Sequence, residues 1–241
     1  MPSQDLRGTS HSRTIDVYDS PSRSKEEPMT GFHSQMYEAR GNRTVATLAK
    51  NGFDALYLPS AAEAAEKILG FISPASKVGF GGSMTAKAME LAERARQKGA
   101  EILDHNAPGL SAEQKMEILR AQLTCDVFIS SANAITMDGY IFNVDGNGNR
   151  VAALSFGPRK NIVVAGLNKV VANLDEAYER LRLYAAPLNN IRLNKPNPCV
   201  KAGYCMDCAL DTRICRIYHI LKRRPSLSDF TVIIVGEELG F

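Results

Sequence analysis

The 241-residue sequence predicts an α/β fold in which crossover helices connect the strands of a mainly parallel sheet. The main observation is an alternation of short runs of apolar and β-branched residues with amphipathic stretches of about 10 to 15 residues, a pattern typical of strand–helix–strand units. The helical stretches also carry start signals, because Ser60 with Glu63 and Ser111 with Gln114 both have the spacing of a capping box. No internal repeat interrupts this order.

The elements follow one another from residue 35. The first predicted helix, over 35–50, ends at Asn51 and Gly52, which suit a helix C-cap. Further helices are predicted over 60–72, 85–98 and 111–123, and from Asn173, whose spacing to Glu176 suits a cap, to just before Pro187. Strands are predicted over 53–58, 77–81, 100–104, 126–131, 140–144, 151–156, 161–166 and 230–235.

The composition separates a polar tail from one folded domain. Residues 1–34 are rich in Ser, Thr, Pro, Arg and Asp and lack apolar periodicity, so we expect a disordered N-terminal tail followed by an α/β domain over 35–241. Hydrophobic residues make up 44% of the chain, which is ordinary for a globular protein. No stretch approaches the roughly 18 to 20 apolar residues of a membrane span, and the N-terminus lacks the apolar region of a secretory signal. A cytoplasmic protein without a membrane span is therefore expected.

The net charge of +3 hides a basic segment. Residues 192–224 contain eight Lys or Arg against Asp207 and Asp211, a net charge of +6, so the rest of the chain sums to −3. This segment could attract an anionic ligand or an acidic partner, or it could be an ordinary solvated surface. The chain has no Trp and few aromatic residues near this segment, so we do not expect it to bind nucleic acid.

A glycine-rich loop is the first candidate site. The sequence VGFGGSMT at 78–85 runs from a predicted strand through paired glycines into a helix. Glycines permit close approach of the backbone to a ligand, and free N–H groups attract an anion. Gly81, Gly82, Ser83 and Thr85 are therefore predicted to hold an anionic group, although a tight strand-to-helix turn would look the same. The loop matches neither the phosphate-binding G-x-x-x-x-G-K-[ST] pattern nor G-x-G-x-x-G.

A dense polar run over 130–150 is the second candidate site. Asp138 and Gly139 lie between apolar runs and predict a tight hairpin turn. Because ligands of α/β sheets bind at the carboxyl ends of strands, the polar residues that follow the predicted strands are candidates for lining a pocket. Asp145 suits a base or hydroxyl acceptor and Arg150 a carboxylate or phosphate clamp. The full set of pocket candidates is Asn133, Asp145, Asn149, Arg150, Asn168 and Lys169. The alternative is an Asx-rich turn whose side chains satisfy only local backbone groups.

Four of the five cysteines form the third candidate site. Cys199, Cys205, Cys208 and Cys215 have the spacing C-x5-C-x2-C-x6-C, whereas Cys125 is isolated beside a predicted strand and suits the core. Clustered thiols in a cytosolic protein favour a metal or redox role over disulfides. Four thiolates can bind zinc or an iron–sulfur cluster. Unliganded thiols or one labile disulfide are the alternatives.

These segments together resemble the LUD (lactate-utilisation) domain family. The resemblance is carried by VGFGGSMT (78–85), NAITMDG (133–139), NVDGNGNRVAA (143–153), FGP (156–158), VVAGLNK (163–169), AAPLN (185–189), the four-cysteine segment and VGEELGF (235–241). It covers residues 36–241 and implies a fold like that of the sugar-phosphate isomerase and CoA-transferase superfamily. It also implies a link to the oxidation of lactate to pyruvate beside iron–sulfur subunits.

The polar run is also similar to that of methylthioribose-phosphate isomerases and their initiation-factor relatives. Here Asn133 stands where that family has its working Asp, and Val144 replaces its Lys. An amide cannot act as a general base near neutral pH, so we expect the scaffold to be shared without the isomerase reaction.

Three functional hypotheses follow. The first is a subunit that binds a small anionic substrate or cofactor for oxidation of lactate or a similar acid, with a four-cysteine iron–sulfur or zinc centre and an iron–sulfur electron-transfer protein as partner. The second is a self-contained enzyme acting on a phosphorylated sugar or acyl substrate. The third is a non-catalytic, zinc-stapled subunit that docks on a partner through its basic segment.

Overall fold

The computed structural model describes residues 31–241, which contain two sheets. The larger sheet is parallel throughout, with six strands in the order β1-β10-β7-β4-β2-β3. Its strands are β1 (Asp54–Leu58), β2 (Lys77–Phe80), β3 (Glu101–Leu103), β4 (Val127–Ser130), β7 (Lys160–Gly166) and β10 (Asp229–Val235). The smaller, mixed sheet has the order β8-β5-β6-β9, from β5 (Ala134–Thr136), β6 (Ile141–Asp145), β8 (Val170–Val171) and β9 (Ile217–Leu221). The predicted α/β class with a mainly parallel sheet is confirmed.

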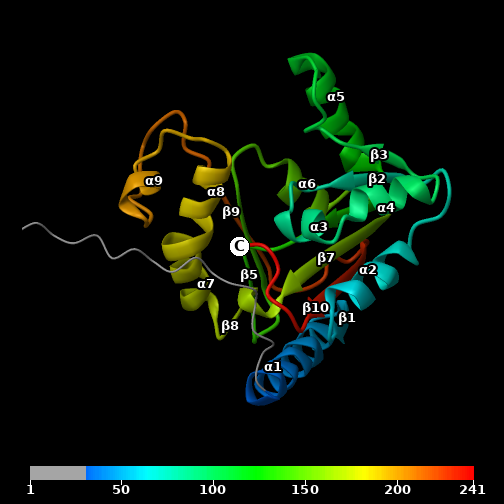
Figure 1. The fold of residues 1–241 in the computed structure, drawn as a ribbon, viewed down its shortest axis with the longest axis vertical. Coiled ribbons are helices and arrows are strands. Elements are labelled where there is room, and N and C mark those ends of the chain that lie inside the picture. Colours follow the sequence, from blue (N-terminus) through cyan, green and yellow to red (C-terminus); the bar gives the residue numbers. More distant parts are fainter. Residues whose placement is uncertain (1–30) are drawn as a thin grey trace, which may run out of the picture.

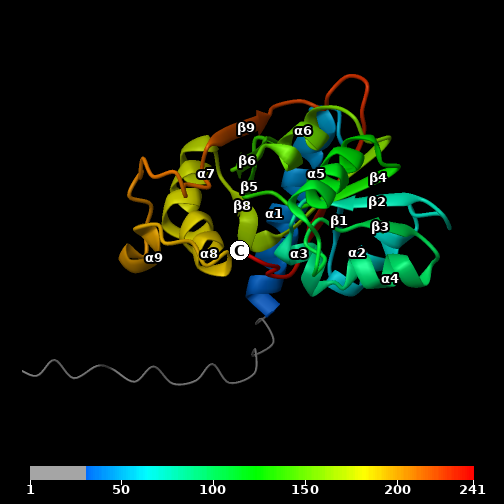
Figure 2. The ribbon, with the colours of Figure 1, turned by 90° about the horizontal axis from the view of Figure 1, so that it is seen from above.

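The helices pack in layers around the two sheets (Figures 1 and 2). They are α1 (Gly31–Lys50), α2 (Ala61–Leu69), α3 (Met84–Ala88), α4 (Leu91–Gln97), α5 (Ala112–Ala121), α6 (Asn149–Ser155), α7 (Leu174–Arg180), α8 (Ala186–Arg192) and α9 (Cys199–Ala202). Apolar side chains of α2, α3 and α4 share one core with one face of the larger sheet. The opposite face packs against α1, α6 and the smaller sheet, whose far side packs against α7 and α8. The smaller sheet is therefore enclosed between two cores.

The local sequence signals form the structures they predict. The Ser60 hydroxyl accepts a hydrogen bond from the Glu63 N–H at the start of α2, and Ser111 forms both halves of its capping box at the start of α5. Asp138 and Gly139 lie in the turn between the antiparallel strands β5 and β6, where Gly139 has a φ of 78° that favours glycine. The predicted hairpin is therefore confirmed.

The strand prediction over 151–156 is wrong, because these residues belong mainly to helix α6. Gly148 ends the preceding loop in the left-handed region, and the Asp145 carboxylate accepts a hydrogen bond from the Val151 N–H at 3.1 Å. The carboxylate thereby satisfies one of the backbone donors that a helix leaves free in its first turn. The contact joins residues six positions apart, and Asp145 lies in β6, outside the helix, so the helical pattern of 149–155 does not reveal it.

Two helix predictions are also corrected. The helix that begins at Asn173 does not end before Pro187; a π-helical turn (Leu181–Ala185) connects α7 to α8, which continues to Arg192. Pro187 lies in the first turn of α8, where a missing N–H costs little. The helix predicted over 85–98 is two helices, separated where Glu90 adopts a φ of 51°. Strands β5, β8 and β9 were not among the predicted elements.

The predicted N-terminal tail, 1–34, lies outside the described residues except for 31–34, which form the start of α1. Within 31–241, no helix has the length and apolar character needed to cross a membrane.

Candidate functional site

A cavity of about 340 Å³ lies at the carboxyl ends of β2, β4 and β7, which are neighbours in the larger sheet. Because these strands are parallel, the residues that follow them meet at one edge. Gly81 to Ser83 follow β2, Ser131 to Asn133 follow β4, and Lys169 ends the 3₁₀ turn (Leu167–Lys169) after β7. Segments far apart in the sequence therefore form the floor of one cavity.

The glycine-rich loop lines this cavity through Gly81, Gly82 and Ser83. A Cβ atom at Gly81 would lie 2.7 Å from the Ser130 hydroxyl oxygen, so only glycine fits where the loop crosses β4. The Ser83 hydroxyl caps α3 by accepting from the Ala86 N–H at 3.1 Å. Thr85 is fully buried beneath the loop and is not part of the lining.

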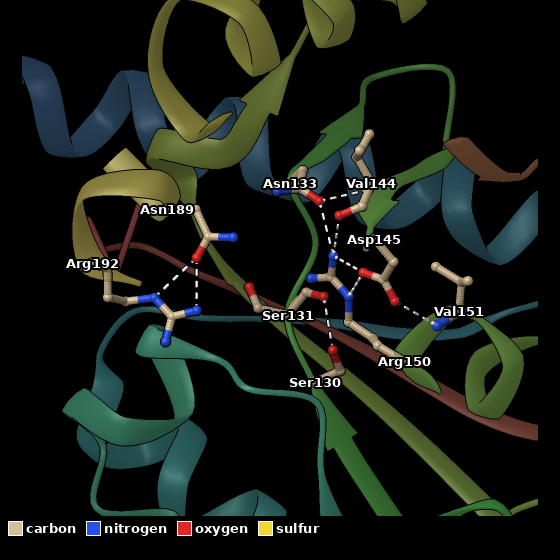
Figure 3. A network of polar contacts seen from close by, with 9 residues as sticks. All are labelled: Ser130, Ser131, Asn133, Val144, Asp145, Arg150, Val151, Asn189 and Arg192. Carbon is tan, nitrogen blue, oxygen red and sulfur yellow. Dashed lines mark hydrogen bonds and ion pairs between the residues drawn. The ribbon is translucent and has the colours of Figure 1, made fainter. Parts of the chain in front are cut away.

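Arg150 and Asp145 form a largely buried ion pair at the side of the cavity (Figure 3). Arg150 Nε and Nη2 donate to Asp145 Oδ1 at 2.8 and 2.5 Å, and Nη2 also reaches Asn133 Oδ1 at 3.1 Å and the Val144 carbonyl at 2.9 Å. The other Asp145 oxygen caps α6 through Val151. The structure therefore brings together three predicted pocket residues, and the carboxylate of Asp145 is neutralised within the protein.

Lys169 is a buried amine, with only 2% of its surface exposed, yet it contributes to the cavity lining. Its Nζ donates to Thr85 Oγ1 at 2.9 Å and to Ser131 Oγ at 3.1 Å. Burial, together with the nearby charges of Arg180 and Arg150, lowers the pKa of Lys169 to about 7. Near neutral pH, a substantial fraction of this amine is therefore uncharged.

Three cationic residues that were not among the predicted pocket residues also line the cavity: Lys115 of α5, Arg192 of α8 and Lys195. Figure 3 shows Arg192 held by Asn189 of the same helix, whose Oδ1 accepts from Arg192 Nε and Nη2 at 2.9 and 2.7 Å. Burial, and to a smaller extent the charge of Arg150, lowers the pKa of Arg192. The only sequence signal for Arg192 and Lys195 was the basic charge of 192–224, which did not reveal that part of this segment faces the cavity, and Lys115 had no such signal.

The remaining predicted pocket residues divide between the cavity and its surroundings. Asn149 lines the cavity, whereas Asn168 does not. The Asn168 side chain instead accepts from the Leu239 N–H and donates to the Gly240 carbonyl, each at 3.1 Å. It thereby ties the segment after β10 to the end of β7.

The four clustered cysteines surround a second, much smaller cavity of about 10 Å³. Cys199 is buried and the other three are partly exposed, and none is in a disulfide. Burial raises the pKa of Cys215 to about 11 and also raises that of Cys199, with further contributions from the neighbouring thiols. Among the described residues, no group of three or more His, Cys, Asp or Glu side chains has the arrangement of metal ligands. The donors are gathered, but in this arrangement they do not form a coordination site. Cys125 lies apart from them in the core.

Comparisons with known proteins identify one family. A sequence model described as the LUD domain matches residues 41–235. A crystal structure of a DUF162 family protein from Deinococcus radiodurans is similar at 15% identity and a TM-score of 0.47, covering 86% of this chain and 99% of that one. A search of the curated proteins found no match.

Proposed function

The chain belongs to the LUD domain family, and we propose that it binds a small organic acid, a hydroxy or oxo acid of the size of lactate, at the carboxyl ends of β2, β4 and β7. The observation that carries this proposal is the charge of the cavity. Five Lys or Arg side chains line it; Arg150 is paired with Asp145 and Lys169 is partly uncharged near neutral pH, so Lys115, Arg192 and Lys195 supply the excess positive charge. The resemblance-based expectation of a link to lactate oxidation agrees with such a ligand.

The cationic side chains of the cavity differ in whether they are already paired within the protein. Arg150 is committed to Asp145, Asn133 and Val144, so it sets the local charge and shape. Arg192, at the end of α8, and Lys195, just after it, make no ion pair among the described residues. Their positive charges are therefore available to bind the carboxylate of a ligand. A charge-assisted hydrogen bond is worth roughly 1.5 to 3 kcal/mol, so two of them together approach or exceed the roughly 4 kcal/mol of a millimolar Kd.

Isothermal titration calorimetry with lactate and pyruvate tests the proposal. Replacing Arg192 and Lys195 together with Gln should weaken binding at least tenfold, because about 1.4 kcal/mol corresponds to one factor of ten. The matched control replaces Lys222 and Arg223 with Gln, which removes the same charge from the basic segment outside the cavity lining. Equal losses in both variants would show long-range attraction rather than a site, and undetectable binding of any small acid to the unaltered chain would refute the proposal.

For the cysteines we propose a metal centre, zinc or an iron–sulfur cluster, held by Cys199, Cys205, Cys208 and Cys215. The proposal is supported by the convergence of all four thiols on one cavity. The raised pKa values of Cys199 and Cys215 mean that these two thiols lose their protons near neutral pH only with a compensating cation, which a metal supplies. When bound, zinc would brace this segment, whereas a cluster would add electron transfer.

Anaerobic purification, with visible absorption and metal content measured together, tests this second proposal. Iron with sulfide and broad visible absorption supports an electron-transfer subunit, and colourless stoichiometric zinc supports a structural clip. Either signal should disappear in Cys208→Ser and persist in Cys125→Ser, the control cysteine in the core. Four titratable thiols with neither metal would overturn the metal centre and leave the acid-binding proposal untouched.

The two alternative functions are distinguished by their requirements. A self-contained enzyme on a phosphorylated sugar or acyl substrate would turn over without a partner and keep its activity in Cys208→Ser. A zinc-stapled docking subunit would instead bind its partner less strongly as salt increases. Neutralising Lys222, Arg223 and Arg224 together should then weaken the complex.

A further inference from the structure

Lys169 is placed as a nucleophile rather than as a counter-ion. It lies on the floor of the cavity, after β7, and its Nζ contacts the hydroxyl oxygens of Thr85 and Ser131. Among the described residues, Lys169 makes no ion pair, although the cavity contains the carboxylate of Asp145. The charged groups that act on it are Arg180 and Arg150, and both are positive. Burial, the absence of a carboxylate partner and two nearby arginines all favour the neutral, nucleophilic form of an amine.

The two hydroxyl partners have different roles. Thr85 Oγ1 donates its proton to the Leu239 carbonyl at 2.9 Å, so it faces Lys169 as an acceptor. Ser131 Oγ accepts from Lys169 and lines the cavity, and its other hydroxyl neighbour, Thr85 Oγ1, lies 3.4 Å away, which is long for an O–H···O hydrogen bond. A Cβ atom at Gly240 would lie 2.9 Å from Thr85 Oγ1 and 3.3 Å from Lys169 Nζ, so the segment after β10 closes over this pair. Thr85 therefore orients the amine, and Ser131 is positioned to donate a proton into the cavity.

We propose that Lys169 is a covalent site for a 2-oxo acid, whose carbonyl group forms an imine with Nζ while its carboxylate is held by Arg192 and Lys195. This inference rests on the proposed acid-binding function and names the substrate class of the same cavity. Nζ attacks the carbonyl carbon, a C–N bond forms, and the carbonyl oxygen takes a proton from Ser131, which regains one from the nitrogen. Loss of water from the resulting carbinolamine gives the imine. Amine and carbonyl are converted to imine and water, with no change in oxidation state.

The imine would activate the bound 2-oxo acid for reaction at the bonds next to its former carbonyl carbon. Once protonated, it draws electron density from the bonds next to the former carbonyl carbon. Asp145 is committed to Arg150 and to the start of α6, so it is poorly placed to act as a base. The covalent function is therefore assigned to Lys169, with Ser131 as its proton carrier.

Reductive trapping tests the inference on the full-length chain. The protein is incubated with pyruvate and sodium cyanoborohydride, which reduces imines, and the carboxyethyl group is then located by peptide mass spectrometry. We expect labelling of Lys169 at least ten times that of the exposed Lys222, with lactate, which has no carbonyl group, giving none. Lys169→Met should lose the label, whereas Lys222→Met, which changes a lysine outside the cavity lining, should retain it on Lys169. Ser131→Ala should slow labelling at least tenfold with pyruvate binding retained.

The outcomes separate the two proposals. If calorimetry shows that pyruvate binds and Lys169 remains unlabelled, or is labelled no more than surface lysines, the covalent inference is overturned and the acid-binding function stands. If pyruvate neither binds nor labels while lactate binds, the inference alone fails. If no small acid binds, both fail. Circular dichroism of each variant establishes that a lost label does not reflect a lost fold.

Discussion

The two cavities of this protein are built in different ways, although both involve the basic segment 192–224. The larger one is floored by residues at the ends of three adjacent parallel strands, whose positions are fixed by the backbone hydrogen bonds of the sheet. The cysteine cavity is enclosed on one side by α8, and its cysteines lie on the four-residue helix α9 and on irregular backbone. There the chain is held by side chains that bind backbone carbonyls, as Arg213 binds those of Cys208 and Cys215 at 2.6 and 2.7 Å.

This difference separates a site that is formed in advance from one that a ligand must complete. Arg150, Lys169 and Arg192 of the larger cavity have hydrogen-bond partners within the protein, and the charges of this cavity are in place without a ligand. The thiols lie close enough together that their neighbours help to raise the pKa values of Cys199 and Cys215, but among the described residues they are not arranged as metal ligands. We therefore expect mutations in the first cavity to change stability and affinity directly, and the second to respond mainly to metal.

The largest effect should come from breaking the Arg150–Asp145 pair. Arg150→Met leaves a carboxylate, 8% exposed, without its main partner, and removing one member of a buried ion pair costs roughly 3 to 5 kcal/mol. Urea unfolding measures the change. Arg159→Gln, which breaks the exposed pair with Asp126, is the control and should change the free energy of unfolding by less than about 1 kcal/mol. Similar values for both variants would mean that the cavity wall is not pre-formed.

Lys169→Met should have the opposite effect to Arg150→Met and increase the free energy of unfolding. The unfolded chain holds this proton up to the ordinary pKa of 10.5, whereas the folded chain releases it near 7. Burial of the amine therefore costs free energy in full below pH 7, and the cost disappears as the pH rises to 10.5. The variant should gain roughly 2 to 4 kcal/mol at pH 7 and little at pH 10.5. Urea unfolding between pH 7 and pH 10.5 measures this difference. If the gain in stability did not change with pH, it would not come from removing a buried charged amine.

Metal should act on the cysteine cavity alone. Zinc at about 100 times its Kd is expected to add roughly 3 kcal/mol to the stability of any unit that must be folded to bind it. Limited proteolysis should therefore show protection of 199–215 by zinc and its loss in Cys208→Ser. The affinity of the larger cavity for pyruvate should stay unchanged in both cases. A parallel change in affinity would show that the two cavities are coupled.

Asn168→Ala should have the smallest effect. Its two hydrogen bonds to the segment after β10 are each worth about 1 kcal/mol at most, because both partners can turn to water when the side chain is removed. We expect a stability loss of about 1 to 2 kcal/mol and a change in pyruvate affinity of less than threefold. A tenfold loss of affinity would instead support the sequence-based prediction that Asn168 contacts the ligand.

Local patterns in the sequence determined the fold class, the helix starts at Ser60, Ser111 and Asn173, and the hairpin at Gly139, because each depends on residues within a few positions of one another. They also identified Asn133, Asp145, Arg150 and Lys169, whose polar side chains interrupt apolar runs at strand ends. The four cysteines were recognised by spacing alone, which cannot say how their thiols are oriented.

Only the tertiary structure decided that residues 151–155 are helical, since Asp145 caps them from the end of a strand. The tertiary structure alone shows that Arg192 and Lys195, which the sequence places only in a basic segment, line the larger cavity. It also buried Lys169 against Thr85 and Ser131, which lie 84 and 38 residues away. The physical reason is the same in each case: charge and burial depend on which segments meet in space, and a parallel sheet brings together strand ends that the sequence keeps far apart.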